Sequence, residues 1–346
     1  MATFLKNLTN NVKAKAKSHA AGPRQDGFHK APEDKLFTPT EASVDGDDCL
    51  HDCSSCTIKY PRKWSIDEDA KLYGHIDAWS THMIVATGKS DWVRDVADEK
   101  GSVMEAVGGS KEPSNGKMKL SASNMPMPNH ATSHSEGTTV LLLPAFTYVD
   151  NVTPTSVPDL ISSVVNNSPT NLDPLSSTPP SFPNPLPANL RLRACNHSAL
   201  ILLCSQATRD ARCGQSAPLL KREFERHLRP LGMYRDMDDD RPGGVGIYFI
   251  SHVGGHKFSA NVLIYRRAPG NAVVANGNGA AVATNGETNK PALQTLGEAS
   301  QCIWLARVRP EDCENIIRYT VGQGKVVKPG TQLRGGFDRE RQLTSW

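Results

Sequence analysis

The apolar run Leu200-Ile-Leu-Leu203, followed by Cys204-Ser-Gln-Ala-Thr-Arg-Asp-Ala-Arg-Cys213-Gly214, decides the fold of this chain. The run predicts a buried strand that ends directly at a cysteine. A second apolar run, residues 245–250, leads into Ser251-His252-Val-Gly-Gly-His256-Lys257. Strands that end in ligand-bearing loops hold a metal rigidly. The pattern predicts an α/β protein with a metal site carried by these two loops.

The four side chains in the two loops form a complete metal-ligand set. Two thiolates and two imidazoles satisfy a four-coordinate site. Residues 205–212 separate the cysteines, a longer spacer than the roughly two to four residues usual in zinc fingers, so the loop is long enough to enclose more than one ion. Gly254 and Gly255 argue against a helix that carries both histidines. A structural zinc, or unrelated buried thiols beside surface histidines, are the alternatives.

Three motifs resemble the sucrase/ferredoxin-like family: Cys204-x8-Cys213-Gly214, His252-Val-Gly-Gly-His256-Lys257-Phe258 and Asn261-Val262. The resemblance runs over most of the chain and is strongest to fungal proteins linked to actin patches, with mitochondrial-inheritance proteins more distant. It implies a thioredoxin-like ferredoxin with a 2Fe–2S cluster. It further implies that Cys204 and Cys213 bind one iron, and His252 and His256 the other.

Length and composition limit the class of protein. A chain of 346 residues favours two domains. The formal net charge of +3, without a basic stripe, argues against nucleic-acid binding. No apolar run approaches the roughly 20 residues of a membrane helix. The eight cysteines follow no signal-peptide core, which favours reduced thiols or metal ligands. We expect a cytoplasmic protein; the lysine-containing, acid-free residues 1–25 leave a mitochondrial presequence as the alternative.

Composition and the resemblance together predict two thioredoxin-like domains. Residues 1–45 read as a flexible N-terminus, and the Pro-, Ser- and Asn-rich residues 166–190 as a linker. Between them, residues 46–165 form a degenerate thioredoxin-like domain with a disordered insertion at 108–137. Residues 191–346 form the ferredoxin domain, with a low-complexity insertion at 268–297.

The expected elements of residues 191–346 follow the order strand, helix, strand, strand, strand, helix. The strands are expected at 198–203, 245–250, 261–266 and 302–308. The first helix is expected to begin after Cys213, with Ser216 as its cap and Pro218 in its first turn. The second covers 310–321. Cys302 and Cys313 fit as ordinary buried thiols.

A second cysteine cluster, Cys49-Leu-His51-Asp-Cys53-Ser-Ser-Cys56, leaves three interpretations open. It can be a solvent-exposed segment, a zinc or auxiliary metal site, or a dithiol pair of Cys53 and Cys56. The aspartates around it raise thiol pKa values, which disfavours an activated nucleophile.

We expect an electron-transfer protein rather than an enzyme with its own substrate, working with a redox partner protein. A structural zinc-binding interaction adaptor and a thiol oxidoreductase using Cys53 and Cys56 are the alternatives. Trp346 either packs onto the domain or is exposed as a docking signal. In the second case its ending resembles tails that the cytosolic iron–sulfur assembly machinery recognises.

Overall fold

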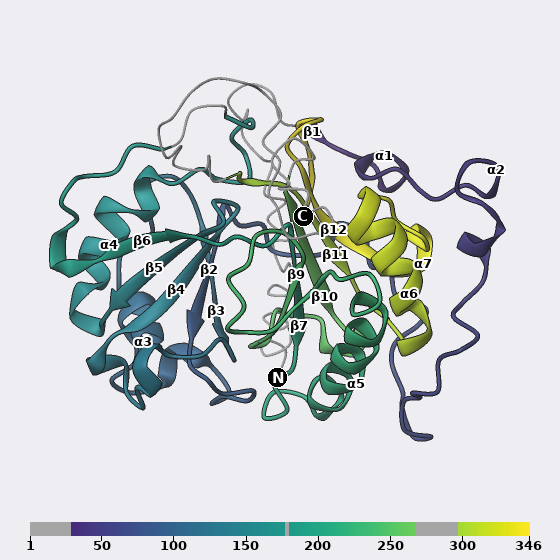
Figure 1. The fold of residues 1–346 in the computed structure, drawn as a ribbon, viewed down its shortest axis with the longest axis horizontal. Coiled ribbons are helices and arrows are strands. Elements are labelled where there is room, and N and C mark those ends of the chain that lie inside the picture. Colours follow the sequence, from purple (N-terminus) through teal and green to yellow (C-terminus); the bar gives the residue numbers. More distant parts are fainter. Residues whose placement is uncertain (1–28, 177–179, 268–296) are drawn as a thin grey trace, which may run out of the picture.

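The structure, a computed structural model, describes residues 29–176, 180–267 and 297–346. Its strands form one mixed sheet in the order β1-β13-β12-β11-β10-β7-β9-β3-β2-β4-β5-β6, with β8 paired to β9. Figure 1 shows α3 and α4 on one outer side of the molecule and α5 and α6 on the other, with the strands between them. The predicted α/β class is confirmed. Across the described ranges, no helix has both the length and the apolar character needed to cross a membrane.

The chain up to residue 194 consists of short elements, of which β2 to β6 form the first half of the sheet, whereas β1 pairs with β13 at the far edge of the second half. They are β1 (His29–Lys30), α1 (Glu33–Leu36), α2 (Ala42–Asp45), β2 (Thr81–Ala86), α3 (Val103–Gly108), β3 (Met118–Ser123), β4 (Thr138–Leu143), β5 (Thr147–Val152), α4 (Val157–Ser163) and β6 (Arg191–Ala194).

The second half contains the longest helix. Its elements are β7 (Ala199–Cys204), α5 (Ala211–Leu228), β8 (Tyr234–Arg235), β9 (Val245–Ile250), β10 (Val262–Arg267), β11 (Ala299–Leu305), α6 (Cys313–Asn315), α7 (Pro329–Gln332), β12 (Leu333–Asp338) and β13 (Leu343–Ser345). A single-turn 3-10 helix at Pro310–Asp312 precedes α6, and a π-helical turn at Ile316–Val321 follows it, which together confirm the predicted helix at 310–321.

The two halves share one strand order. In the first half, β2 lies between the parallel β3 and the antiparallel β4, and β5 pairs with β4. In the second half, β7 lies between the parallel β9 and the antiparallel β10, and β11 pairs with β10. The halves join where β3 and β9 pair at Ser123 and Ile250. The predicted order of four strands and two helices in residues 191–346 is found, but the structure adds β6, β8, α7, β12 and β13 to it; the first half repeats the predicted order.

The core has two outer layers and one shared inner layer, because side chains alternate between the faces of a strand. Ile201 of β7 and Phe224 of α5 belong to one outer cluster, and Val85 of β2 and Leu160 of α4 belong to the other. The inner faces of both halves meet in a third cluster, among whose members are Ile84, Leu141, Leu200 and Trp304. Each such residue contributes about 1.5–3 kcal/mol when fully buried. The halves therefore stabilise one another.

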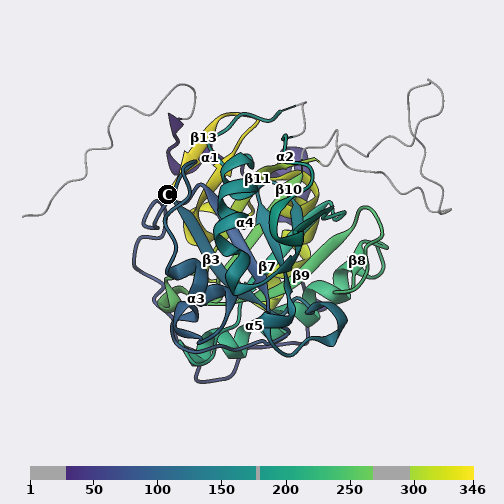
Figure 2. The ribbon, with the colours of Figure 1, turned by 90° about the vertical axis from the view of Figure 1, so that its left-hand side faces the viewer.

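Figure 2 views the molecule from the side of the first half, with α3 and α4 nearest the viewer. Residues 108–137, predicted to be a disordered insertion, instead contain β3, and this prediction is wrong. The strand was missed because Met-Lys-Leu-Ser-Ala-Ser has little intrinsic β-propensity. Pairing with β2 along its whole length stabilises it instead.

The other segments expected to lack structure differ among themselves. Residues 1–28 and 268–296 lie outside the described ranges, whereas residues 29–45 carry β1, α1 and α2, so flexibility up to residue 45 was overestimated. Within the expected linker at 166–190, the Asn171 side chain donates to the Trp79 carbonyl. Arg339 Nε donates to the Asp173 carbonyl at 2.7 Å. This part of the segment therefore packs against both halves; the division into two domains stays a prediction.

Candidate metal centre

Strands β7 and β9 bring the two predicted ligand loops to the same edge of the sheet. They are parallel neighbours, and Cys204 at the end of β7 lies in register with Ile250 at the end of β9. His252 follows β9 by two residues. Because the carboxyl ends of parallel strands meet at one edge, open α/β sheets bind ligands there.

Cys213 lies in the first turn of α5, not in a loop before the helix. Asp210 is the N-cap and accepts a hydrogen bond from the Arg212 backbone N–H at 2.9 Å. The predicted start at Ser216 is therefore wrong, and Pro218 lies inside the helix. Asp210 is as good a cap as serine. Its position places Cys213 near the positive end of the helix dipole, which favours a thiolate.

The structure brings three of the four predicted ligands together. The ligand atoms of Cys204, Cys213 and His252 all lie within 4.8 Å of one another. Cys204 Sγ is 3.8 Å from His252 Nδ1. His256 is not part of this group; its ring lies next to that of His252, with 5.4 Å between the ring centroids. The donor set is compact at the thiols and wider at the histidines.

The histidine loop is not helical between its two imidazoles. Gly254 has φ +93° and Gly255 has φ +69°, both in a region that side-chain-bearing residues rarely adopt. A Cβ atom at Gly255 would lie 2.7 Å from Nη1 and Nη2 of Arg334, whereas the space at Gly254 is open. The glycines therefore provide both the turn and the close approach of Arg334.

Burial divides the ligand set. The side chains of Cys204, in β7, and Cys213, in α5, are buried. His252 is half-buried, and His256 is exposed. The thiol side of the centre is thus closed to water, and the histidine side is open to it.

The Cys204 and Cys213 thiols form a buried hydrogen bond that shifts their pKa values in opposite directions. A hydrogen bond between them raises the pKa of Cys204, and burial raises it further. The same hydrogen bond lowers the pKa of Cys213, and His252 and Ser259 beside it act in the same direction. The pair therefore retains a proton that a metal has to displace, because metals bind thiolates.

Two basic side chains lie close to Cys204, and its thiolate interacts favourably with both. Burial lowers the pKa of Lys119 on β3, and it lowers the pKa of Arg334 on β12 to about 10. The Arg334 guanidinium stacks on Trp304 at 4.3 Å and donates to the Gly254 carbonyl at 3.1 Å. Positive charges in this position offset the negative charge of a thiolate centre.

The first half of the chain supports the ligand loops directly, a role that the sequence did not reveal. Gln206 Nε2 donates to the Trp92 and Val93 carbonyls at 3.3 and 2.6 Å, and Gln206 Oε1 accepts from the His252 N–H at 2.8 Å. Ser205 on the same loop also donates to a carbonyl of the first half. No local pattern signals these contacts, because they join segments far apart in the sequence.

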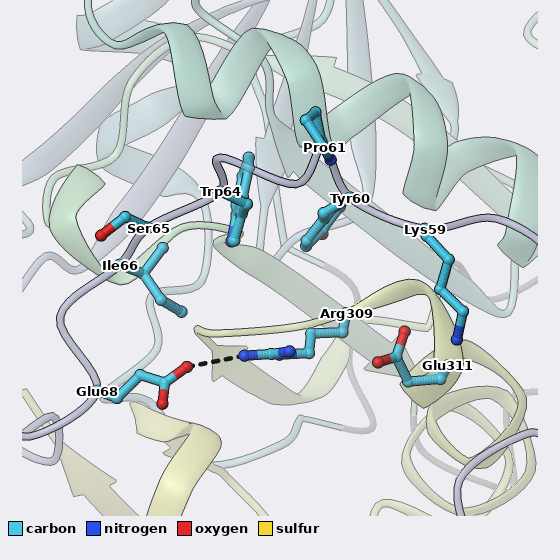
Figure 3. Close-up of a pocket in the computed structure, with 9 residues that line it drawn as sticks. All are labelled: Lys59, Tyr60, Pro61, Trp64, Ser65, Ile66, Glu68, Arg309 and Glu311. Atoms are coloured by element: carbon cyan, nitrogen blue, oxygen red, sulfur yellow. Dashed lines mark hydrogen bonds and ion pairs between the residues drawn. The ribbon is translucent and has the colours of Figure 1, made fainter.

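The segment 59–68 contacts the centre from outside. Arg212 Nη1 donates to the Ser65 carbonyl at 3.1 Å. Together with Arg309 and Glu311, residues of this segment line a pocket of about 430 Å³, shown in Figure 3. An ion pair of 2.7 Å between Arg309 and Glu68 runs across it. The lining contains none of the four predicted ligands.

The second cysteine cluster does not assemble as a unit. Cys53 groups with His227 and Glu314, and neither Cys49, Cys56 nor His51 belongs to that group. Burial, with the Glu223 carboxylate beside the thiol, raises the pKa of Cys56 to about 11. This is the opposite of what a nucleophilic thiol needs. All eight cysteines are free, and Cys302 and Cys313 are buried as predicted.

Trp346 is covered in the structure. Its ring lies 4.3 Å from that of Trp79 and 6.3 Å from that of Phe337, centroid to centroid, and it is 9% exposed. Of the two interpretations of this residue, packing onto the domain is the one the structure displays.

Comparison with known proteins agrees with this donor set. The model of the sucrase/ferredoxin-like family matches residues 72–335, a range that includes all four ligands. The chain belongs to the sucrase/ferredoxin-like family. It is 31% identical to actin patches distal protein 1 of Saccharomyces cerevisiae, over 60% of this chain and 67% of that protein.

More distant members of the family share a shorter stretch. Identity is 30% to altered inheritance of mitochondria protein 32 of Clavispora lusitaniae, over 38% of this chain and 33% of that protein. It is 29% to the protein of the same name from Meyerozyma guilliermondii, over 37% and 32%. The match thus spans about a third of these relatives. No solved structure matches the chain.

Proposed function

We propose that this chain binds a 2Fe–2S cluster through Cys204, Cys213, His252 and His256 and serves as an electron-transfer protein. The supporting observation is that two buried thiols and the His252 imidazole converge at the ends of β7 and β9, and that the His256 ring lies beside His252. Two cysteines and two histidines are a ligand set known to hold such clusters, with one pair on each iron. The compact thiol side and the wider histidine side suit a group with two metal ions.

A bound cluster of this kind accepts and releases one electron. The exposure of the residues around the centre indicates the side from which an electron reaches it. Cys204 and Cys213 are closed off by protein, so the exposed His256 marks the side on which a redox partner protein docks. An imidazole that binds metal through one nitrogen exchanges a proton at the other. Lys119 and Arg334 stabilise added negative charge near Cys204.

We further infer that both halves are thioredoxin-like. The support is the repeated order of a strand and helix, then a parallel strand, then two antiparallel strands and a helix. The turns after β2 and β3, Thr87-Gly-Lys-Ser90 and Asn124-Met125, contain no cysteine or histidine. The first half therefore supports the metal centre without forming one of its own there.

The cellular role follows only from the family. Similarity to actin patches distal protein 1 supports a link to actin patches. We add to the proposal a cytoplasmic location and a role in redox or metal homeostasis, which would follow from the proposed cluster. Insertion of the cluster by the cytosolic iron–sulfur assembly machinery, through Trp346, belongs to the same proposal and requires the Trp346 ring to leave its contacts with Trp79 and Phe337.

A structural zinc site is the second candidate, because three ligand atoms within 4.8 Å also suit a single ion. Visible absorption of the protein purified without oxygen separates the two. A 2Fe–2S protein is red-brown, whereas a zinc protein is colourless and releases zinc but no iron.

A further inference from the structure

We propose that Cys53, His227 and Glu223, with Glu314 beside them, form a second metal site that takes a zinc ion. It lies at the opposite end of α5 from the first centre. Cys213 occupies the first turn of α5 and His227 the last. At about 1.5 Å per residue, the two positions are roughly 21 Å apart along the helix. The sites are therefore independent, and this inference goes beyond the proposed function.

Three donor atoms of different chemistry point at one position. Arg226 Nη2 lies at that position. It donates to Cys53 Sγ at 3.4 Å, to His227 Nε2 at 2.8 Å and to Glu223 Oε1. A single cationic nitrogen thus occupies a point surrounded by a thiol, an imidazole lone pair and a carboxylate. These are the ligand types that zinc prefers.

The separations between the donor atoms match a tetrahedral zinc site. Cys53 Sγ lies 3.8 Å from His227 Nε2, and His227 Nε2 lies 3.4 Å from Glu223 Oε1. With zinc bonded to sulfur at about 2.3 Å and to nitrogen or oxygen at about 2.0–2.2 Å, tetrahedral ligands lie roughly 3.4–3.6 Å apart. A ligand atom of Glu314 lies within 4.8 Å of those of Cys53 and His227 and provides a fourth donor.

The carboxylate of Glu223 is an unusual group to bury. Its side chain is 1% exposed, and its Oε2 atom has no hydrogen-bond partner among the described residues. Glu223 and His227 are one helical turn apart on α5, so both project from the same face. Burying a carboxylate is costly unless a cation compensates it, and here the Arg226 guanidinium occupies the place of that cation.

Arg226 can leave this point without losing every contact. Its side chain is 42% exposed, and its Nη1 already donates to Ser55 Oγ at 3.3 Å. Zinc binding would displace the Cys53 thiol proton to solvent and move the guanidinium outward. Bound zinc then has the thiolate and the Glu223 and Glu314 carboxylates as its charged ligands, and the nearby Arg226 guanidinium offsets the one negative charge that remains.

The test uses the full-length protein with its native cofactor content. Zinc is titrated against a chromophoric chelator, and iron and zinc are counted separately after gel filtration. We expect one zinc site whose affinity falls by at least about tenfold in Cys53→Ser and in His227→Gln, while iron content is unchanged. Arg226→Ala should bind zinc more tightly than the wild type, because the competing cation is gone.

Two control variants separate ligand loss from general damage. His51→Gln changes an exposed histidine in the same cysteine segment. Arg229→Ala removes the C-cap arginine of α5, which pairs with Glu225 and not with the proposed ligands. Both should bind zinc as the wild type does. Absence of this site in the wild type, or zinc affinity unchanged by Cys53→Ser, His227→Gln or Arg226→Ala, overturns the proposal. Loss of iron alone would contradict only the proposed cluster.

Discussion

The side-chain oxygen of Gln206 accepts a hydrogen bond from the backbone N–H of His252 at 2.8 Å. The same amide donates to the Val93 carbonyl at 2.6 Å. One buried side chain therefore fixes the histidine loop to the cysteine loop, and both to the first half of the molecule.

Gln206→Leu should destabilise the protein by about 1–3 kcal/mol, because it leaves buried backbone groups without partners. It should also speed loss of the metal, since the His252 loop is no longer held. Thermal unfolding and the rate of bleaching in air measure the two effects. Gln323→Leu, at an exposed position, is the matched control and should change neither.

Cys204→Ser and Cys213→Ser should each abolish the visible absorption, because a thiolate anchor is lost. Cys302→Ala should keep it, although this thiol is also buried. Absorption spectra of the anaerobically purified variants make the comparison. Equal loss in all three would mean that the ligands are misassigned.

Gly255→Ala should be more damaging than Gly254→Ala. Both substitutions place a side chain at positive φ, but only the one at Gly255 displaces the Arg334 guanidinium. The additional cost is about 1–3 kcal/mol, typical of overpacking a filled site. Chemical denaturation of the two variants gives the difference directly, and equal stabilities would show that Arg334 yields without cost.

The midpoint potential should depend on pH, because the imidazole ligands exchange protons on the open side of the centre. It should be flat in acid, where the free ring nitrogens stay protonated in both oxidation states. At higher pH it should fall by about 59 mV per unit for each proton coupled to the electron. His256→Cys should lower the potential and reduce this dependence. Voltammetry across pH is the measurement, and a flat profile would exclude histidine ligation.

The sequence predicted the ligand-bearing strands well, because residues 200–203 and 245–250 are continuous apolar runs of the kind that fill the centre of a sheet. It failed at β3, whose residues 118–123 have little local preference and are held by neighbours. The start of α5 was misplaced because two good caps, Asp210 and Ser216, compete within a few residues.

The four proposed ligands were recognisable from two local motifs, since each pair lies on one short segment. The contacts of Gln206 and the convergence of Cys53 with His227 were not. They depend on chain segments that only tertiary packing brings together. The one local signal for the proposed zinc site is the spacing of Glu223 and His227 on α5. That spacing is common on ordinary helix surfaces.

The central claim is that Cys204, Cys213, His252 and His256 hold a cluster of iron and sulfide. Its most direct test is iron, acid-labile sulfide and zinc analysis of the anaerobically purified full-length protein, beside Cys204→Ser. We predict iron and sulfide in equal amounts in the wild type and neither in the variant. Zinc without iron or sulfide at this centre in the wild type would contradict the account.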